Sequence, residues 1–192
     1  MGNIVLVEFM SLDGVIQAPG NAQEDPEGFP HGGWTQPFFD DHRRYMPEIL
    51  TAAGAYLFGR STFDIFAAYW PTVTDPDDRI AGALNARPKY VVSHTLDEPT
   101  WGPTTVLSGA VPEKVAALKA EITDDLLVIG SARLAQTLIV HDLVDEYRLW
   151  LHPIVLGSGK RLFPDRATPL TLKAVDFRTT GDGLVIATYR RP

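Results

Sequence analysis

The chain has 192 residues, of which 45% are hydrophobic and 21% charged, and its formal net charge is −7. These values suit one globular domain over residues 1–192 and argue against a disordered, collagen-like or coiled-coil chain. The net negative charge argues against nucleic-acid or membrane partners. The sequence has no cysteine, no long apolar run and no signal-peptide pattern, so we expect a cytoplasmic protein without disulfides.

The first third of the chain predicts one strand, one long loop and one helix. Residues 4–10 form a nearly continuous apolar run, which favours a strand buried on both faces. Residues 17–34 are rich in glycine and proline and predict a long loop, which in a compact domain is usually functional. Thr35 is expected to cap a helix that has Pro37 in its first turn and runs to about Ala53.

The rest of the chain continues as strands and helices and then changes character. The expected order is strand 54–59, helix 61–69, helix 75–85, strands 89–93 and 104–107, helix 111–122, strand 125–130 and helix 132–140. Three alternating strands follow, over 145–152, 170–177 and 184–189, and a turn at 180–183 joins the last two. This order predicts an α/β protein with a mostly parallel central sheet and an antiparallel C-terminal hairpin.

Three junctions at the carboxyl ends of predicted strands carry small or polar residues. They are formed by Gly59, Arg60, Ser61 and Thr62, by Ser93, and by Gly130, Ser131, Ala132 and Arg133. Glycine lets a ligand approach the backbone, a helix start offers unpaired N–H groups, and an arginine can bind phosphate. Each junction alone also fits an ordinary tight turn, and none matches a dinucleotide-binding glycine fingerprint. Together they indicate a nucleotide lying across the strand ends.

Several acidic and aromatic residues could contact a substrate. Glu8 interrupts an apolar strand; burial would raise its pKa and make it a proton donor, whereas exposure or an arginine partner would make it structural. Asp41 and its neighbour Asp40 lie early in a helix, where acids also simply favour the helix dipole. Trp34 and Phe38 could stack on a planar heterocycle or belong to the core.

Metal and hydrolase sites are not indicated by the sequence. The five histidines show no metal-ligand spacing, and no acidic cluster has a calcium-loop pattern, so we expect no metal. The glycine-rich segment 157–161 is neither a nucleophile elbow nor a phosphate-binding loop of the Walker type. This segment fits a basic loop between strands.

An ordered set of motifs nevertheless resembles a known family. The segments are 11–15 (SLDGV), 57–63 (LFGRSTF), 90–93 (YVVS), 128–131 (VIGS) and 153–163 (PIVLGSGKRLF). In this order, over nearly the whole chain, they resemble dihydrofolate-reductase-like proteins of the riboflavin-biosynthesis reductase C-terminal-domain type. The resemblance implies a three-layer fold with a sheet of about eight strands, and a homodimer through the sheet edge or the C-terminal strands.

The resemblance also implies a cofactor site and an activity. NADPH would lie across the strand ends: residues 59–62 would hold its phosphates, Ser93 would lie beside the 2′-phosphate, residues 130–133 would form the pyrophosphate turn and Ile16 would lie near the nicotinamide. We therefore expect a reductase that transfers hydride to a small-molecule substrate, either a pterin- or pyrimidine-like planar heterocycle or another C=N or C=C bond. Glu8 is the first proton-donor candidate and Asp41 the second. The alternative is a non-catalytic module that binds a nucleotide or a drug-like ligand on the same fold.

Overall fold

The computed structural model describes residues 2–25, 28–163 and 169–192. The helices are η1 (Ala22–Glu24), η2 (Gln36–Phe38), α1 (Phe39–Ala52), α2 (Arg60–Tyr69), η3 (Trp70–Thr72), α3 (Arg79–Ala86), α4 (Val111–Glu121) and α5 (Ala132–Val140). The strands are β1 (Ile4–Ser11), β2 (Ala55–Gly59), β3 (Lys89–Val92), β4 (Thr104–Leu107), β5 (Leu126–Ile129), β6 (Glu146–His152), β7 (Lys173–Thr179) and β8 (Val185–Arg190). None of the helices among these residues is long and apolar enough to cross a membrane.

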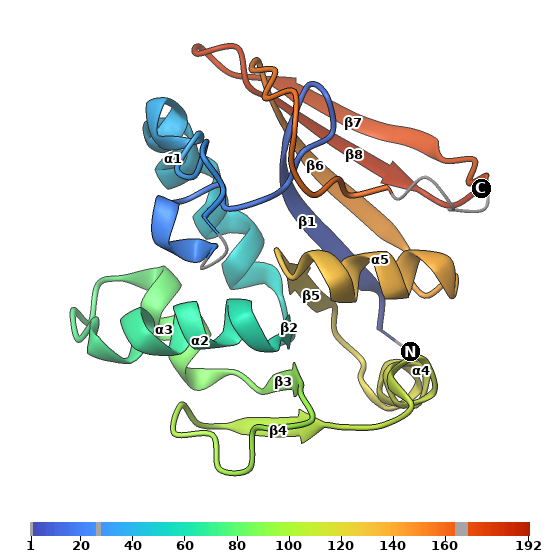
Figure 1. The fold of residues 1–192 in the computed structure, drawn as a ribbon. Coiled ribbons are helices and arrows are strands. Elements are labelled where there is room, and N and C mark those ends of the chain that lie inside the picture. The colour runs from blue at the N-terminus through green and yellow to red at the C-terminus, as the bar shows by residue number, and fades with distance from the viewer. Residues whose placement is uncertain (1, 26–27, 164–168) are drawn as a thin grey trace.

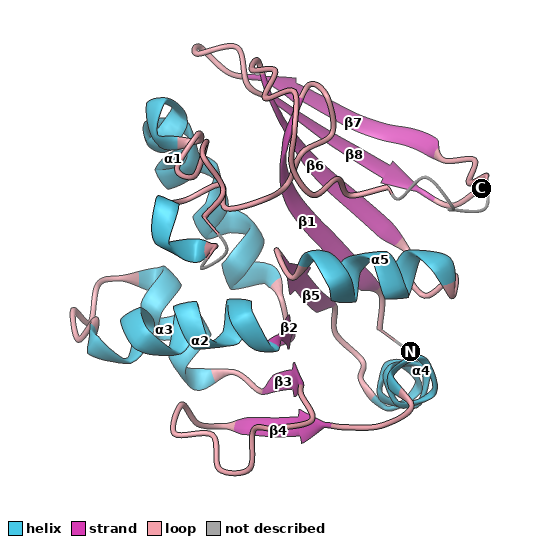
Figure 2. Cartoon of the chain, viewed as in Figure 1, coloured by secondary structure: helices cyan, strands magenta, loops and turns pink. Residues whose placement is uncertain are grey.

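The strands form one eight-stranded sheet in the order β4-β3-β2-β5-β1-β6-β8-β7 (Figures 1 and 2). The first six strands in this order pair in parallel, whereas β8 pairs antiparallel with both β6 and β7. The predicted mostly parallel sheet with an antiparallel C-terminal hairpin is therefore confirmed. β1 lies between β5 and β6 and is buried along nearly its whole length, as its continuous apolar run predicts.

Helices cover both faces of the sheet and form a three-layer structure (Figure 1). On one face, α4 and α5 pack on Leu6, Leu126 and Leu149. On the other face, α1, α2 and α3 pack on a cluster that includes Val7 and Trp150. Because successive residues of a strand point to opposite faces, the two cores are built from alternate residues of β1.

Three predicted boundaries differ from the structure for local reasons. The helix expected from residue 75 begins at Arg79, because the Asp78 carboxylate accepts hydrogen bonds from the N–H groups of Ile80 and Ala81 and caps the helix there. The expected cap at Thr35 is wrong, since its hydroxyl donates to the Pro19 carbonyl, and the first turn is a 3₁₀ helix. The strand expected from residue 170 begins at Lys173, because the leucines before it pack on the α4/α5 core.

Candidate active site

The starts of α2 and α5 meet at the carboxyl edge of the sheet. α2 begins directly after Gly59, the last residue of β2, and α5 begins after the Ile129–Ser131 turn that follows β5. The Gly59 N–H donates to Ser131 Oγ at 2.9 Å, and the Ser131 N–H donates to Thr62 Oγ1 at 3.1 Å. These bonds tie the first and third predicted junctions into one structure.

The backbone at this meeting point is tight and has unpaired donors. Gly130 and Ser131 have φ of 54° and 64°, the left-handed region that lets β5 turn sharply into α5. A Cβ on Gly59 would lie 3.3 Å from Ser131 Cβ, so glycine allows this close approach. Among the described residues, no side chain caps the start of α2 or of α5. Their first-turn N–H groups and positive dipole ends therefore form a place for an anion.

Arg60 and the end of β3 extend this anion site along the edge. Arg60 Nε lies 2.8 Å from both carboxylate oxygens of Asp64, and its Nη1 donates to Thr95 Oγ1 at 3.4 Å. Ser93 is buried, and its Oγ accepts the N–H groups of Thr95 and Leu96, so this hydroxyl orders the turn that Arg60 reaches. The second predicted junction thus lies beside the first.

The remaining predicted phosphate contacts lie at the two helix starts. Ser61 and Arg133 are exposed in the first turns of α2 and α5, and Ala132 is the first residue of α5. The structure therefore places residues 59–62 and 130–133 at one pair of helix starts, and their contact with phosphate stays a prediction.

Glu8 lies on the α5 face of the sheet, where its carboxyl has no charged partner in the described part of the chain. Val7 pairs with Ile129, so Glu8 comes level with Gly130 at the turn into α5. Its side chain is 3% exposed, and its Oε1 is buried without a hydrogen-bond partner among the described residues. Burial raises the pKa of Glu8 from 4.5 to about 8. The group is therefore a neutral carboxylic acid at pH 7, which can donate a proton.

The loop after β1 is held against the segment around residue 160. The Asp13 carboxylate accepts the N–H groups of Leu156 and Gly157 at 3.1 and 2.8 Å, and the Ile16 N–H donates to the Lys160 carbonyl at 2.9 Å. The hydrogen bond from Ser11 and those from the backbone at Leu156 and Gly157 lower the pKa of Asp13 to about 2. This loop buries Ile16, which is 5% exposed and packs on the α5 core.

On the other face of β1, an aromatic cluster surrounds two histidines. His42 and His152 are buried, and their rings contact Phe9, Trp34, Phe38 and Trp150. Trp34 and Phe38 each place an edge-on ring 5.1 Å from the His152 ring, and Trp34 Nε1 donates to the Gln17 carbonyl. Both predicted substrate-stacking residues therefore pack on protein groups here, and their role toward a ligand stays a prediction.

Asp41 lies beside this cluster in the first turn of α1. It is 8% exposed, and its Oδ2 is buried without a hydrogen-bond partner among the described residues. Asp40, by contrast, is exposed. Because α1 and Glu8 lie on opposite faces of β1, Asp41 and Glu8 approach the site from different sides. Of these two neighbouring acids, Asp41 is the one whose carboxylate is placed to hydrogen-bond a buried ligand.

Sequence reasoning missed the histidine pair. The two residues lie 110 positions apart, and each alone is an ordinary histidine at the end of an element. No group of three or more metal-ligating side chains exists in the part of the chain that the structure describes, so the pair is not part of a larger metal cluster. The available signal was the position of His152, immediately before the segment 153–163.

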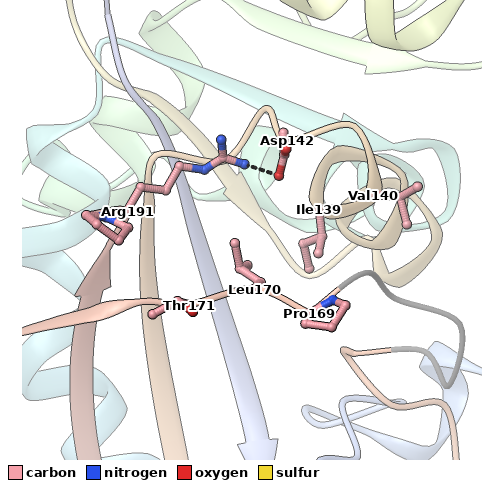
Figure 3. Close-up of a pocket in the computed structure, with 8 residues that line it drawn as sticks. Ile139, Val140, Asp142, Pro169, Leu170, Thr171 and Arg191 are labelled. Carbon is pink, nitrogen blue, oxygen red and sulfur yellow. Dashed lines mark hydrogen bonds and ion pairs between the residues drawn. The ribbon is translucent and has the colours of Figure 1, made fainter.

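A cavity of about 370 Å³ lies away from this site (Figure 3). Its walls include Ile139 and Leu170, and Arg191 lies 2.6 Å from Asp142 among its lining residues (Figure 3). Since Arg190 pairs with Glu146, the first residue of β6, this cavity is at the amino end of the parallel strands.

Comparison with known proteins agrees with this architecture. Residues 3–186 match the model of the RibD C-terminal domain family. The uncharacterized protein YyaP of Bacillus subtilis is 35% identical over 144 residues, which cover 74% of this chain and 76% of YyaP.

Two solved structures are similar in fold. A putative riboflavin biosynthesis protein from a Shewanella species has a TM-score of 0.68 at 23% identity, with 100% of this chain and 99% of that chain covered. A Thermotoga maritima diaminohydroxyphosphoribosylaminopyrimidine deaminase/5-amino-6-(5-phosphoribosylamino)uracil reductase has a TM-score of 0.68 at 16% identity. All of this chain and 57% of that bifunctional protein are covered.

Proposed function

Because the chain belongs to the RibD C-terminal domain family, whose match spans residues 3–186, we propose that it is an NADPH-dependent reductase of a small planar heterocycle. The observation that carries the proposal is the pair of uncapped helix starts tied together at Gly59 and Ser131. Two converging dipole ends suit a pyrophosphate better than a single phosphate, because each helix start can bind one phosphate group.

The groups around the helix starts would contact different parts of the cofactor. The N–H groups of the first turns of α2 and α5 would bind the pyrophosphate oxygens. Arg60, oriented by Asp64 and Thr95, would bind the 2′-phosphate that distinguishes NADPH from NADH. Glu8, three residues before the end of β1, and Ile16, in the loop after it, would lie near the nicotinamide where it faces the substrate. When bound, the reduced nicotinamide supplies the hydride.

The protein's contribution to the chemistry is orientation and a proton. Glu8 holds a proton at neutral pH because burial keeps its carboxyl uncharged. Asp41 would accept a hydrogen bond from an N–H or O–H group of the substrate through its unpartnered Oδ2. Trp34 and Phe38 would form an apolar wall that excludes water from the reacting atoms. A pterin- or pyrimidine-like ring, flat and rich in N–H donors, fits these groups.

Calorimetric titration with NADPH and NADH tests the cofactor site. We expect NADPH to bind more tightly, and Arg60→Ala to weaken NADPH binding roughly tenfold or more while changing NADH binding little, since the lost contact is charge-assisted. Arg79→Ala is the matched control, because Arg79 is exposed at the start of α3. Equal affinities of both nucleotides that Arg60→Ala leaves unchanged would contradict the assigned phosphate contact.

Oxidation of NADPH in the presence of pterins, flavins and pyrimidines tests the reductase itself. Turnover with one of these classes identifies the substrate type. Tight NADPH binding without oxidation by any of them would favour the non-catalytic nucleotide-binding module over the reductase. Failure of both nucleotides to bind would reject the reductase and the nucleotide-binding module, and would leave a module for a drug-like ligand on the same fold.

A further inference from the structure

Two buried histidines from distant parts of the chain face each other beside the candidate site. Nε2 of His42, in the first turn of α1, lies 2.8 Å from Nε2 of His152, the last residue of β6. The ring planes are perpendicular, with centroids 5.1 Å apart. His152 is fully buried and His42 is 7% exposed. The proposed cofactor contacts use neither residue.

The hydrogen bonds of His152 determine where the protons of the pair lie. Its Nδ1 is 2.8 Å from the Trp150 carbonyl and 3.4 Å from the Met10 carbonyl. Carbonyl oxygens only accept, so Nδ1 of His152 must carry a proton, and the neutral ring presents a lone pair at Nε2. His42 must then donate through its Nε2–H. The pair therefore has one defined tautomer on each ring.

Both rings are neutral at pH 7. Burial, with a further contribution from the neighbouring His152, lowers the pKa of His42 to about 4, although Asp41 raises it. Burial likewise lowers the pKa of His152 to about 4, against the effect of its two backbone carbonyls. The other rings packed against the pair are uncharged, namely Phe9, Trp34, Phe38, Phe39 and Trp150. Asp41 is thus the carboxylate whose charge acts on the pair.

We infer that His42 and His152 are a positioning pair that fixes the first turn of α1, and with it Asp41, against the end of β6. The ladder between β1 and β6 reaches Ser11 and His152, so His152 is anchored to a rigid strand. The N–H···N bond connects this strand to α1, and the stacking of His42 on Phe9 at 4.2 Å fixes the ring orientation. Because the proton on Nδ1 of His152 is held by a backbone carbonyl and both rings are neutral, the pair is not assigned a proton transfer to substrate. Its role is to position Asp41, the residue proposed to bind the substrate.

The tautomers can be read directly by nitrogen-15 NMR of the histidine side chains in the free protein. At pH 7 we expect protonated Nδ1 on His152, protonated Nε2 on His42, and a coupling across the N–H···N bond. A proton on Nε2 of His152, or an imidazolium on either residue at pH 7, would overturn the inference. This measurement needs no variant and no ligand.

Two substitutions test whether the bond positions the helix. His152→Leu removes the acceptor, whereas His152→Gln offers a side-chain oxygen to His42 Nε2–H. We expect amide exchange at residues 43–46, whose partners are carbonyls of the first turn of α1, to be roughly tenfold faster in the Leu variant and near wild type in the Gln variant, the effect of one buried hydrogen bond. Exchange that is unchanged in the Leu variant, or equally accelerated in both, would contradict positioning by this bond.

His141→Leu is the matched control, because His141 is an exposed histidine at the end of α5. If the Leu variant does not fold, the Gln variant and the wild-type tautomers still decide. The inference rests on the proposed function only for its consequence for substrate binding. Because both readouts use the protein without nucleotide, failure of the pair and failure of the reductase are distinguishable.

Discussion

Replacing Glu8 by glutamine should make the protein more stable at alkaline pH and change it little at acidic pH. In the folded protein the pKa of Glu8 is about 8, against 4.5 for an exposed glutamate. Between these values the folded chain keeps a proton that the unfolded chain releases, so the free energy of unfolding falls as pH rises through this range. Below pH 4.5 both states are protonated, and above about pH 8 the full loss is reached.

The size of the effect follows from the pKa change. Raising a pKa from 4.5 to about 8 corresponds to roughly 5 kcal/mol at about 1.4 kcal/mol per pH unit. Because natural domains are stable by only about 5–15 kcal/mol, this should be visible in urea unfolding at pH 5 and pH 9. The difference between Glu8→Gln and wild type isolates this group from the histidines. Glu48→Gln, at an exposed position of α1, is the control. If the free energy of unfolding of Glu8→Gln differs from that of wild type by the same amount at both pH values, the assignment of Glu8 as a buried neutral carboxyl is refuted.

Three further outcomes are expected. Gly59→Ala should weaken NADPH binding several-fold in calorimetry, because the added Cβ would lie 3.3 Å from Ser131 Cβ in the turn before α5. Gly82→Ala is the control and should leave the affinity unchanged, because its added Cβ would meet no neighbouring atom within 4 Å. Equal effects of the two substitutions would contradict the close approach at the helix starts. Lys89→Met should lower the free energy of unfolding by about 2–4 kcal/mol, since the buried ammonium donates to three backbone carbonyls near the end of α3, and leave nucleotide affinity unchanged. The two buried histidines should lower stability as pH drops from 6.5 towards 4, because the unfolded chain binds protons on His42 and His152 in this range and the folded chain does not. Glu8 acts in the opposite direction above pH 4.5, so the effect is measured as the difference between His152→Gln and wild type. The variant should lose less stability than wild type over this range, and identical acid profiles would count against the buried pair.

Much of the fold could be predicted from the sequence because hydrophobic periodicity is local. The apolar run of β1 predicts a buried strand, and the small residues after β2 and β5 predict tight turns, from residues only a few positions apart in the sequence. The glycine-rich turns before α2 and α5 were predictable for the same reason, since each glycine and the helix start that follows it are neighbours in sequence. Asp78 shows the limit of such local reasoning. This cap lies three residues after the first helix signal, at residue 75, and moves the start of α3 to Arg79, although both positions carry residues that commonly begin helices.

The parts that escaped prediction depend on contacts between distant residues. Nothing near His42 indicates that its Nε2 meets a ring from β6. The Ser93 hydroxyl could be assigned to a ligand from sequence, yet it accepts two N–H groups of its own turn. Whether the Glu8 side chain was buried could not be decided from the apolar run that it interrupts, because its burial depends on the helices that pack over that face of the sheet.

Amide shift mapping with NADP⁺ tests the central claim most directly, namely that the two tied helix starts hold the cofactor. In nitrogen-15-labelled protein, saturating NADP⁺ should shift the amides of residues 59–62 and 130–133 most strongly, with smaller changes around Ser93. Shifts confined to the cavity that contains Ile139 and Arg191 at the other end of the sheet, or no shifts at all, would contradict the account.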